Sequence, residues 1–218
     1  PEATDSKFYL DGIDLDLQWA KIDGEKINPT ISSTGLSFNV DKEEFVWECE
    51  VIINPKENTA LEGLYISNGM YCTQCEAEGF RKITYYPDRP DVMAEFFVRI
   101  EGDKDTLLSN GNPTAQGQGW IEWHDPWPKP SYLFALVAGN LISVSDTFKT
   151  NSGRNVELNI YVRPGDEDKC SFSMDALKTS MKWDEENYGR EYDLDLFNIV
   201  AVDDLSLIHI SEPTRPTL

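Results

Sequence analysis

The chain has 218 residues, of which 40% are hydrophobic and 11% aromatic, so it can bury a sizeable core and is not typical of a disordered protein. Acidic residues outnumber basic ones by 39 to 19. The resulting formal charge of −20 repels phosphate backbones, so we expect no nucleic acid partner. No apolar run approaches the roughly 18 residues of a membrane-spanning helix, so we expect no membrane partner either.

The chain starts at Pro1 without a charged and then apolar leader, and we expect its natural beginning to be clipped. From there, the first two thirds predict one short β-strand after another. The predicted strands are 13–19, 36–40, 45–53, 64–67, 70–75, 80–86, 93–100, 120–124 and 132–138. Hairpin turns are predicted at Asp23-Gly24, Asn68-Gly69 and Asn110-Gly111, because tight turns favour a positive φ. The spacing predicts a mainly β fold, an antiparallel, saddle-like β-sandwich over residues 1–139.

The pattern changes after Gly139. An alternating strand at 156–162 precedes a helix from Asp166 to Tyr188, which Gly189 ends. The predicted apolar face of that helix consists of Cys170, Met174, Leu177, Met181 and Tyr188. A strand at 194–202 follows, and its run 199–202 is apolar on both faces, which indicates burial. A strand, a helix and a strand predict the opening of a second, α/β-type domain over residues 140–204.

The last stretch, 205–218, fits neither half of the chain. It is polar and interrupted by proline, and it follows a buried strand without continuing the fold. We interpret it as a non-native tail.

Four cysteines do not make a disulfide framework, and they give a weak indication of a cytoplasmic protein. Cys72 and Cys75 form one C-x-x-C pair. A structural zinc would need two further ligands at a regular spacing, and a thioredoxin-like site would need a helix start in a βαβ unit. The other candidate ligands, at no recognisable spacing, are Cys49, Cys170, His124 and His209. Buried free thiols are the favoured interpretation.

A catalytic constellation is hard to assemble from these residues. The sequence contains no G-x-S-x-G, no phosphate-binding glycine loop and no H-E-x-x-H. His124 lies between tryptophans in Trp-His-Asp-Pro-Trp, where we expect it to pack against aromatic rings, since a lone histidine needs a positioned partner to act as a base. We therefore predict no catalytic residue and no metal ligand in this chain.

Gln74, Glu76 and Glu78 stand out because they occupy alternate positions beside the two thiols. On an extended backbone their side chains would project to one face. A partly screened carboxylate there would hold an ammonium ion well. The alternative is an ordinary solvated acidic edge. On the residues alone, the solvated edge is the favoured interpretation.

Long ordered segments of the chain resemble the amino-terminal part of the aminopeptidase N family, and in particular its cytosolic, bacterial-type zinc alpha-aminopeptidases (gluzincins). The segments are 61–65, 72–81, 83–93, 107–112, 129–139, 180–186 and 191–204. The resemblance implies a β-rich amino-terminal domain over 1–139 and the truncated start of a thermolysin-like zinc metallopeptidase domain over 140–204. It also implies an enzyme that removes N-terminal residues from peptides, and we expect it to be a cytoplasmic monomer.

In that family a glutamate binds the free α-amino group of the substrate and a glutamine lines the same pocket. By resemblance these positions are Glu76 and Gln74. The family's single zinc ion, its ligands and its general base belong to motifs that follow the position of Asp204, and this chain lacks them. We therefore expect the 218-residue chain itself to be inactive.

The alternative is a stand-alone β-sandwich binding module for carbohydrate or protein. It would use exposed aromatic residues such as Trp120, Trp123 and Trp127. The helix and strand predicted after Gly139 argue against it, because a self-contained sandwich does not need them.

Overall fold

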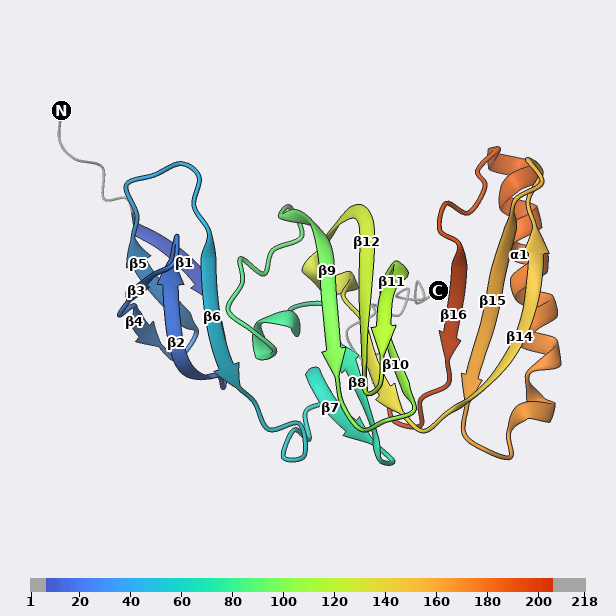
Figure 1. Cartoon of the computed structure of the whole chain (residues 1–218), viewed down its shortest axis with the longest axis horizontal. Helices are drawn as coiled ribbons and strands as arrows, with labels where there is room; N and C mark the ends of the chain where they lie inside the picture. Colours follow the sequence, from blue (N-terminus) through green and yellow to red (C-terminus); the bar gives the residue numbers. More distant parts are fainter. Residues whose placement is uncertain (1–6, 206–218) are drawn as a thin grey trace, which may run out of the picture.

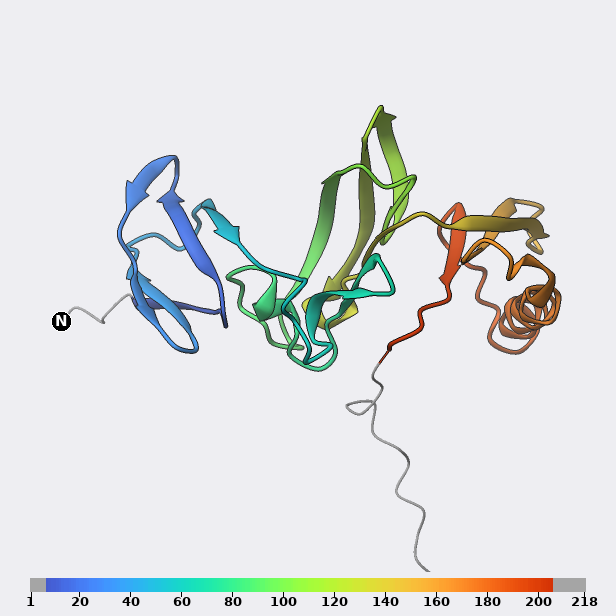
Figure 2. The ribbon, with the colours of Figure 1, turned by 90° about the horizontal axis from the view of Figure 1, so that it is seen from below.

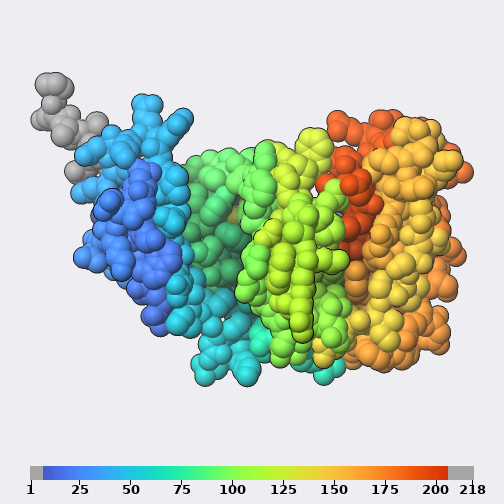
Figure 3. Space-filling model, in the orientation of Figure 1, coloured from blue at the N-terminus to red at the C-terminus, as the bar shows by residue number. Residues whose placement is uncertain are grey.

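A computed structural model describes residues 7–205 of the chain. The molecule is elongated, and three modules follow one another along its long axis in chain order (Figure 1), each a closely packed body (Figure 3). The fold is mainly β, as predicted, and it consists of several mostly antiparallel sheets and one α-helix. No helix within residues 7–205 is long and apolar enough to cross a membrane. The proposed non-native tail falls almost entirely outside the described residues.

The first module consists of two three-stranded sheets. One has the order β1 (Lys7–Asp11), β5 (Gly35–Asn39) and β4 (Thr30–Ser32), and the other β3 (Glu25–Ile27), β2 (Asp16–Ile22) and β6 (Trp47–Ile52). Leu10, Leu36 and Phe38 fill the core between them. The predicted Asp23-Gly24 turn joins β2 to β3, and both of its residues have positive φ.

The middle module also has two sheets. The four-stranded sheet has the order β10 (Thr106–Ser109), β13 (Leu136–Gly139), β8 (Met70–Gln74) and β7 (Gly63–Ser67). The three-stranded sheet has the order β11 (Asn112–Gly117), β12 (Trp120–Pro130) and β9 (Met93–Glu101). Ile100, Leu108 and Trp123 form the buried centre. The predicted Asn68-Gly69 turn closes the β7–β8 hairpin.

The third module is a mixed sheet of β14 (Ile142–Lys149), β15 (Asn155–Val162) and β16 (Leu196–Val200). Helix α1 (Ser171–Tyr188) covers one face of it and is seen nearly end-on in Figure 2. As predicted, Gly189 ends the helix in the left-handed conformation, where glycine meets no Cβ penalty. The helix connects β15 to β16, which run parallel, so this part has the predicted strand–helix–strand order.

Strand β16 lies between two cores, which explains its apolar character on both faces. Phe197 and Ile199 pack against the core shared with α1. Leu196 and Val200 point to the opposite side and pack with the core of the middle module. The strand therefore joins the third module to the second.

Several predicted elements are wrong. Residues 80–86 are not a strand but contain a 3-10 helix, Phe80–Lys82, because the chain there turns around a buried carboxylate described below. The Asn110-Gly111 turn does not make a hairpin, since β10 and β11 belong to different sheets. Asn110 instead bonds the carbonyl of Leu133 and the amide of Ala135.

The sequence patterns also do not predict the short strands β1, β3, β4, β10 and β11. Further differences concern the second half of the chain. Residues 132–138 divide into a 3-10 helix, Ser131–Leu133, and the short strand β13. Strand β14 was not predicted, although Ile142, Val144 and Phe148 carry an alternating signal. The predicted apolar face of the helix includes Tyr188, but this residue is exposed, and its ring packs edge-on against Trp183.

The core beneath α1 can be tested with Leu158, which has 0% exposure on β15. We predict that Leu158→Ala lowers the free energy of unfolding by about 2–5 kcal/mol, because it removes buried surface and leaves a cavity. Urea denaturation of the 218-residue chain measures this. Val46→Ala, at an exposed loop position, is the control and is expected to change little. A Leu158→Ala midpoint equal to that of the control would contradict the assigned core.

Candidate functional site

Gln74 is the last residue of β8 and lies opposite Gly63 of β7. The chain then turns at once, because the Gly79 amide donates a hydrogen bond of 2.8 Å to the Cys75 carbonyl. The peptide bond between Glu76 and Ala77 within this turn is cis. The prediction that Gln74, Glu76 and Glu78 project from one extended strand is therefore wrong. Only Gln74 belongs to the strand.

Glycine at position 79 lets this turn fold back on the hairpin. A Cβ atom there would lie 2.4 Å from the Gln74 carbonyl oxygen and 2.9 Å from the Gly63 amide nitrogen. Side chains cannot approach backbone atoms so closely, so a larger residue would push the turn away. Close packing thus holds the segment after Gln74 against the end of the β7–β8 hairpin.

The two carboxylates of the turn differ in their surroundings. Glu78 is exposed and its Oε2 lies 3.3 Å from Nη1 of Arg81. Glu76 is half-buried, and no side chain or backbone group within residues 7–205 pairs with its carboxylate. Gln74 lies next to it and donates from Nε2 to the Glu76 backbone carbonyl at 3.4 Å. The structure therefore brings Gln74 and Glu76 together, and the Glu76 carboxylate has no protein partner within residues 7–205.

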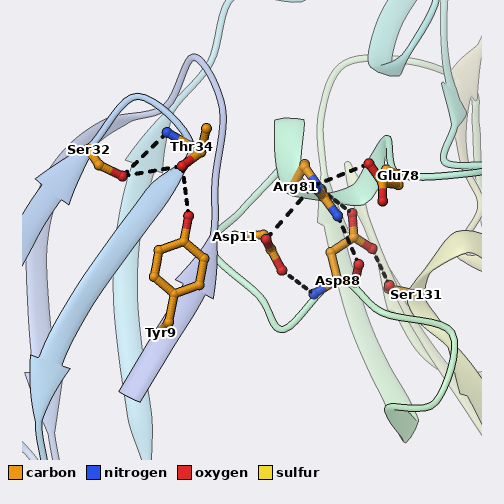
Figure 4. A network of polar contacts seen from close by, with 8 residues as sticks. All are labelled: Tyr9, Asp11, Ser32, Thr34, Glu78, Arg81, Asp88 and Ser131. Carbon is orange, nitrogen blue, oxygen red and sulfur yellow. Dashed lines mark hydrogen bonds and ion pairs between the residues drawn. The ribbon is translucent and has the colours of Figure 1, made fainter. Parts of the chain in front are cut away.

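A buried ion pair between Arg81 and Asp88 lies next to the turn that contains Glu78 (Figure 4). The Asp88 side chain has 1% exposure, and its Oδ2 accepts hydrogen bonds from both the backbone amide and Nε of Arg81, each at 3.1 Å. Ser131 donates a short hydrogen bond to the other oxygen of Asp88. Arg81 Nη2 also donates to the Asp88 carbonyl at 3.0 Å. These contacts satisfy a charge that would otherwise be costly to bury.

The same network reaches the first module. Asp11, at the end of β1, accepts a 3.0 Å hydrogen bond from the Asp88 amide and lies 3.7 Å from Arg81 Nη1. Figure 4 shows Arg81 between Asp11, Glu78 and Asp88. Sequence reasoning missed these residues. The segment around Asp88 has turn composition, and no local pattern shows that a carboxylate there is buried.

The two thiols beside the site are buried, as predicted. Cys72 has 2% and Cys75 3% exposure, and no cysteine within the described residues forms a disulfide. Burial, with a smaller effect from the charge of Asp88, raises the pKa of Cys75 to about 12. Burial also raises the pKa of Cys72. Both thiols are therefore protonated and poor nucleophiles at neutral pH.

A metal would need several ligating side chains gathered at one place. In residues 7–205, no three His, Cys, Asp or Glu side chains are grouped so that they could hold one. The described residues thus do not fit the zinc ion that the resemblance implies.

The other sequence candidates lie on the three-stranded sheet of the middle module. His124 stacks on Phe97 with ring centroids 4.0 Å apart, which confirms that it packs against an aromatic ring. Of the three tryptophans considered for a binding module, Trp123 has 3% exposure and Trp120 packs under Arg99. Only Trp127, with 52% exposure, is open to solvent to any large extent. The three do not form one exposed aromatic platform.

Fold and site together define a β-rich domain in which a carboxylate without a partner among residues 7–205 and a neighbouring amide lie at the end of a sheet strand, an arrangement suited to a cationic group. The sequence profile of the Peptidase M1 N-terminal domain matches residues 6–133. This chain belongs to the aminopeptidase N (M1) family of zinc aminopeptidases.

The relatives agree along nearly the whole chain. Aminopeptidase N of Caulobacter vibrioides is 51% identical over 207 residues, which cover 90% of this chain and 24% of that protein. Aminopeptidase N of Escherichia coli is 50% identical over 210 residues, 92% of this chain and 24% of that protein. A solved structure, Legionella pneumophila aminopeptidase A in complex with aspartic acid, has a TM-score of 0.86 at 32% identity and covers 94% of this chain and 25% of that one. The chain thus spans about a quarter of the length of these relatives.

The buried pair below the turn can be tested by substitution. We predict that Asp88→Ala lowers the free energy of unfolding by about 3–5 kcal/mol, because the Arg81 guanidinium loses its buried counter-charge. Urea denaturation measures the effect. Asp91→Ala is the matched control, since Asp91 also pairs with an arginine, Arg89, but at the exposed surface, where ion pairs contribute little. Equal midpoints for the two variants would contradict the assigned role of Asp88.

Proposed function

We propose that this chain is part of a zinc aminopeptidase in which the Glu76 carboxylate binds the free α-amino group of a peptide and Gln74 lines the same pocket. One observation carries the proposal. In a member of this family, a half-buried carboxylate at the end of β8 lacks a partner among the described residues, whereas its neighbour Glu78 is paired with Arg81. A structural carboxylate in such a position would be expected to have a cation of its own.

An ammonium group fits this carboxylate chemically. A charge-assisted hydrogen bond to a partly desolvated carboxylate is about twice as strong as one between neutral groups. Fixing the amino terminus in this way allows one peptide bond, the first, to reach the cleavage site, and such positioning favours an exopeptidase. The formal charge of −20 would also attract the cationic end of a peptide.

The bond-cleaving chemistry of the proposed enzyme comes from outside the described residues. A bound zinc ion would supply Lewis-acid polarisation of the scissile carbonyl and an activated water. The sequence has no H-E-x-x-H to hold that ion. We assign residues 1–139 to a saddle-like β-sandwich amino-terminal domain and 140–204 to the start of a thermolysin-like catalytic domain. Peptides with a free amino terminus are the proposed substrates, and a cytoplasmic monomer the proposed state.

The rival, a stand-alone sandwich that binds carbohydrate or protein, has less support. It relies on exposed tryptophans, and Trp123 is in the core. It also gives no reason for the third module, whose strand β16 packs with the core of the second.

The anchoring role is testable in an active chimaera that joins residues 7–204 of this chain to the remaining part, about three quarters, of Caulobacter vibrioides aminopeptidase N. We predict that Glu76→Gln lowers kcat/KM for an aminoacyl anilide roughly 10- to 100-fold, since a hydrogen bond to a charged group contributes about 1.5–3 kcal/mol. The 218-residue chain alone, assayed with added zinc, is expected to be inactive.

Two controls make the result specific. Hydrolysis of the N-acetylated substrate, which has no ammonium group, should not respond to Glu76→Gln. Glu78→Gln, two residues away in the same turn, should leave kcat/KM near that of the parent. Unchanged kinetics for Glu76→Gln, or an equal loss for Glu78→Gln, would refute the anchoring role.

A further inference from the structure

The chain that leaves β16 is held by the β7–β8 hairpin. Tyr65 Oη donates a 2.7 Å hydrogen bond to the Asp204 carbonyl. Ser67 Oγ donates to the Asp204 carboxylate at 2.9 Å and accepts from the Asp204 amide at 3.0 Å. Three polar groups of one residue are therefore satisfied by two side chains that lie about 137–139 positions earlier in the sequence.

Asp203 adds a second attachment. Its Oδ2 accepts hydrogen bonds from Asn68 Nδ2 at 3.0 Å and from Arg163 Nη1 at 2.8 Å. Asn68 lies in the β7–β8 turn, and Arg163 directly follows β15. Residues 203–204 therefore connect the second and third modules, and we refer to them with Tyr65 and Ser67 as the latch.

The buried half of the latch is the stronger one. Tyr65 has 0% and Ser67 2% exposure, so their hydrogen bonds to the exposed Asp204 are part-buried and partly shielded from competing water. Burial of its hydroxyl raises the pKa of Tyr65, with a smaller effect from the neighbouring Cys72, so Tyr65 remains a donor at neutral pH. The ion pair between Arg163 and Asp203 is more open to solvent and contributes less.

The register places the latch on the face of the hairpin that carries Gln74. Residues directly opposite in an antiparallel pair share a face, as do alternate residues along one strand. Tyr65 is opposite Cys72, Ser67 opposite Met70 and Gly63 opposite Gln74. Tyr65, Ser67 and Gln74 therefore share one face of the same two strands. Asp204 is bound on the side of the sheet from which Gln74 projects.

We propose that Tyr65 and Ser67 are positioning residues that fix the segment after β16 relative to the site formed by Gln74 and Glu76. This inference rests on the proposed function, because it concerns the distance between the amine site and the cleavage site. The latch keeps the amine site and the cleavage site at a fixed distance from each other. A peptide whose amino group is bound by Glu76 therefore has its first peptide bond at the cleavage site. Small misplacements of a reacting bond are costly to the rate.

A double-mutant cycle in the chimaera distinguishes positioning from a general structural role. The variant Tyr65→Phe with Ser67→Ala should lower kcat about tenfold or more in the parent. The same pair should cause little further loss in the Glu76→Gln background, since the amine that it positions is no longer held. Tyr71→Phe, on the opposite face of β8, is the matched control and should leave kcat unchanged.

The outcomes separate the two proposals. An equal fold-loss in both backgrounds, or a kcat within about twofold of the parent, overturns the positioning role while Glu76→Gln keeps its own effect. A Glu76→Gln variant with normal kcat/KM overturns the proposed function instead.

A second measurement on the 218-residue chain does not depend on activity. The Asp204 amide donates to Ser67, so its hydrogen exchange should be slow and should accelerate about tenfold or more in Ser67→Ala. Equal exchange rates in the two proteins would overturn the latch.

Discussion

The buried ion pair between Arg81 and Asp88 organises the candidate site. Asp88 accepts hydrogen bonds from the backbone and the side chain of Arg81, and its own backbone amide reaches Asp11 of the first module. A buried carboxylate is stable in few conformations of the surrounding chain, because its oxygen atoms need hydrogen-bond donors and a counter-charge. The segment 76–88 is therefore held in one conformation, although it contains little regular secondary structure. Glu76 lies in the turn just before this network, where Gln74 donates to its carbonyl and the Gly79 amide donates to the Cys75 carbonyl.

The same constraint explains why two glutamates so close in sequence differ in role. Arg81 is already occupied by Asp88, and its remaining nitrogen lies near Glu78 and Asp11. Glu76 lies beside Gln74 just after β8, and the ion pairs of this cation within the described residues are with Asp11, Glu78 and Asp88. The acidic turn thus contains one carboxylate, of Glu78, that is paired with Arg81 and one, of Glu76, that has no partner among the described residues and that we propose as the ligand-binding group. The number of charged residues in the sequence does not distinguish Glu76 from Glu78.

Local sequence patterns correctly predict the elements whose structure depends mainly on neighbouring residues. The Asp23-Gly24 and Asn68-Gly69 hairpins, the helix that Gly189 ends and the alternating strands of β5 and β9 all follow from turn chemistry and periodicity. The errors fall where distant contacts decide the outcome. Residues 80–86 wrap around Asp88, whose burial depends on Ser131 and Asp11. The Asn110-Gly111 turn spans two sheets because Asn110 binds Leu133 and Ala135. For the site, the alternate spacing draws attention to Gln74, Glu76 and Glu78, but it predicts an extended strand where the structure has a turn after Gln74. The role of Gln74 and Glu76 is inferred from the family resemblance alone.

The central claim is that the Glu76 carboxylate holds the amino terminus of a peptide. A crystal structure of the chimaera with a bound free amino acid tests it most directly. We predict the ligand's ammonium nitrogen at about 2.7–2.9 Å from a Glu76 carboxylate oxygen, the range of a charge-assisted hydrogen bond, with the Gln74 amide in the same pocket. A ligand whose amino group is held by other residues, with Glu76 turned away or paired to an internal cation, would contradict it.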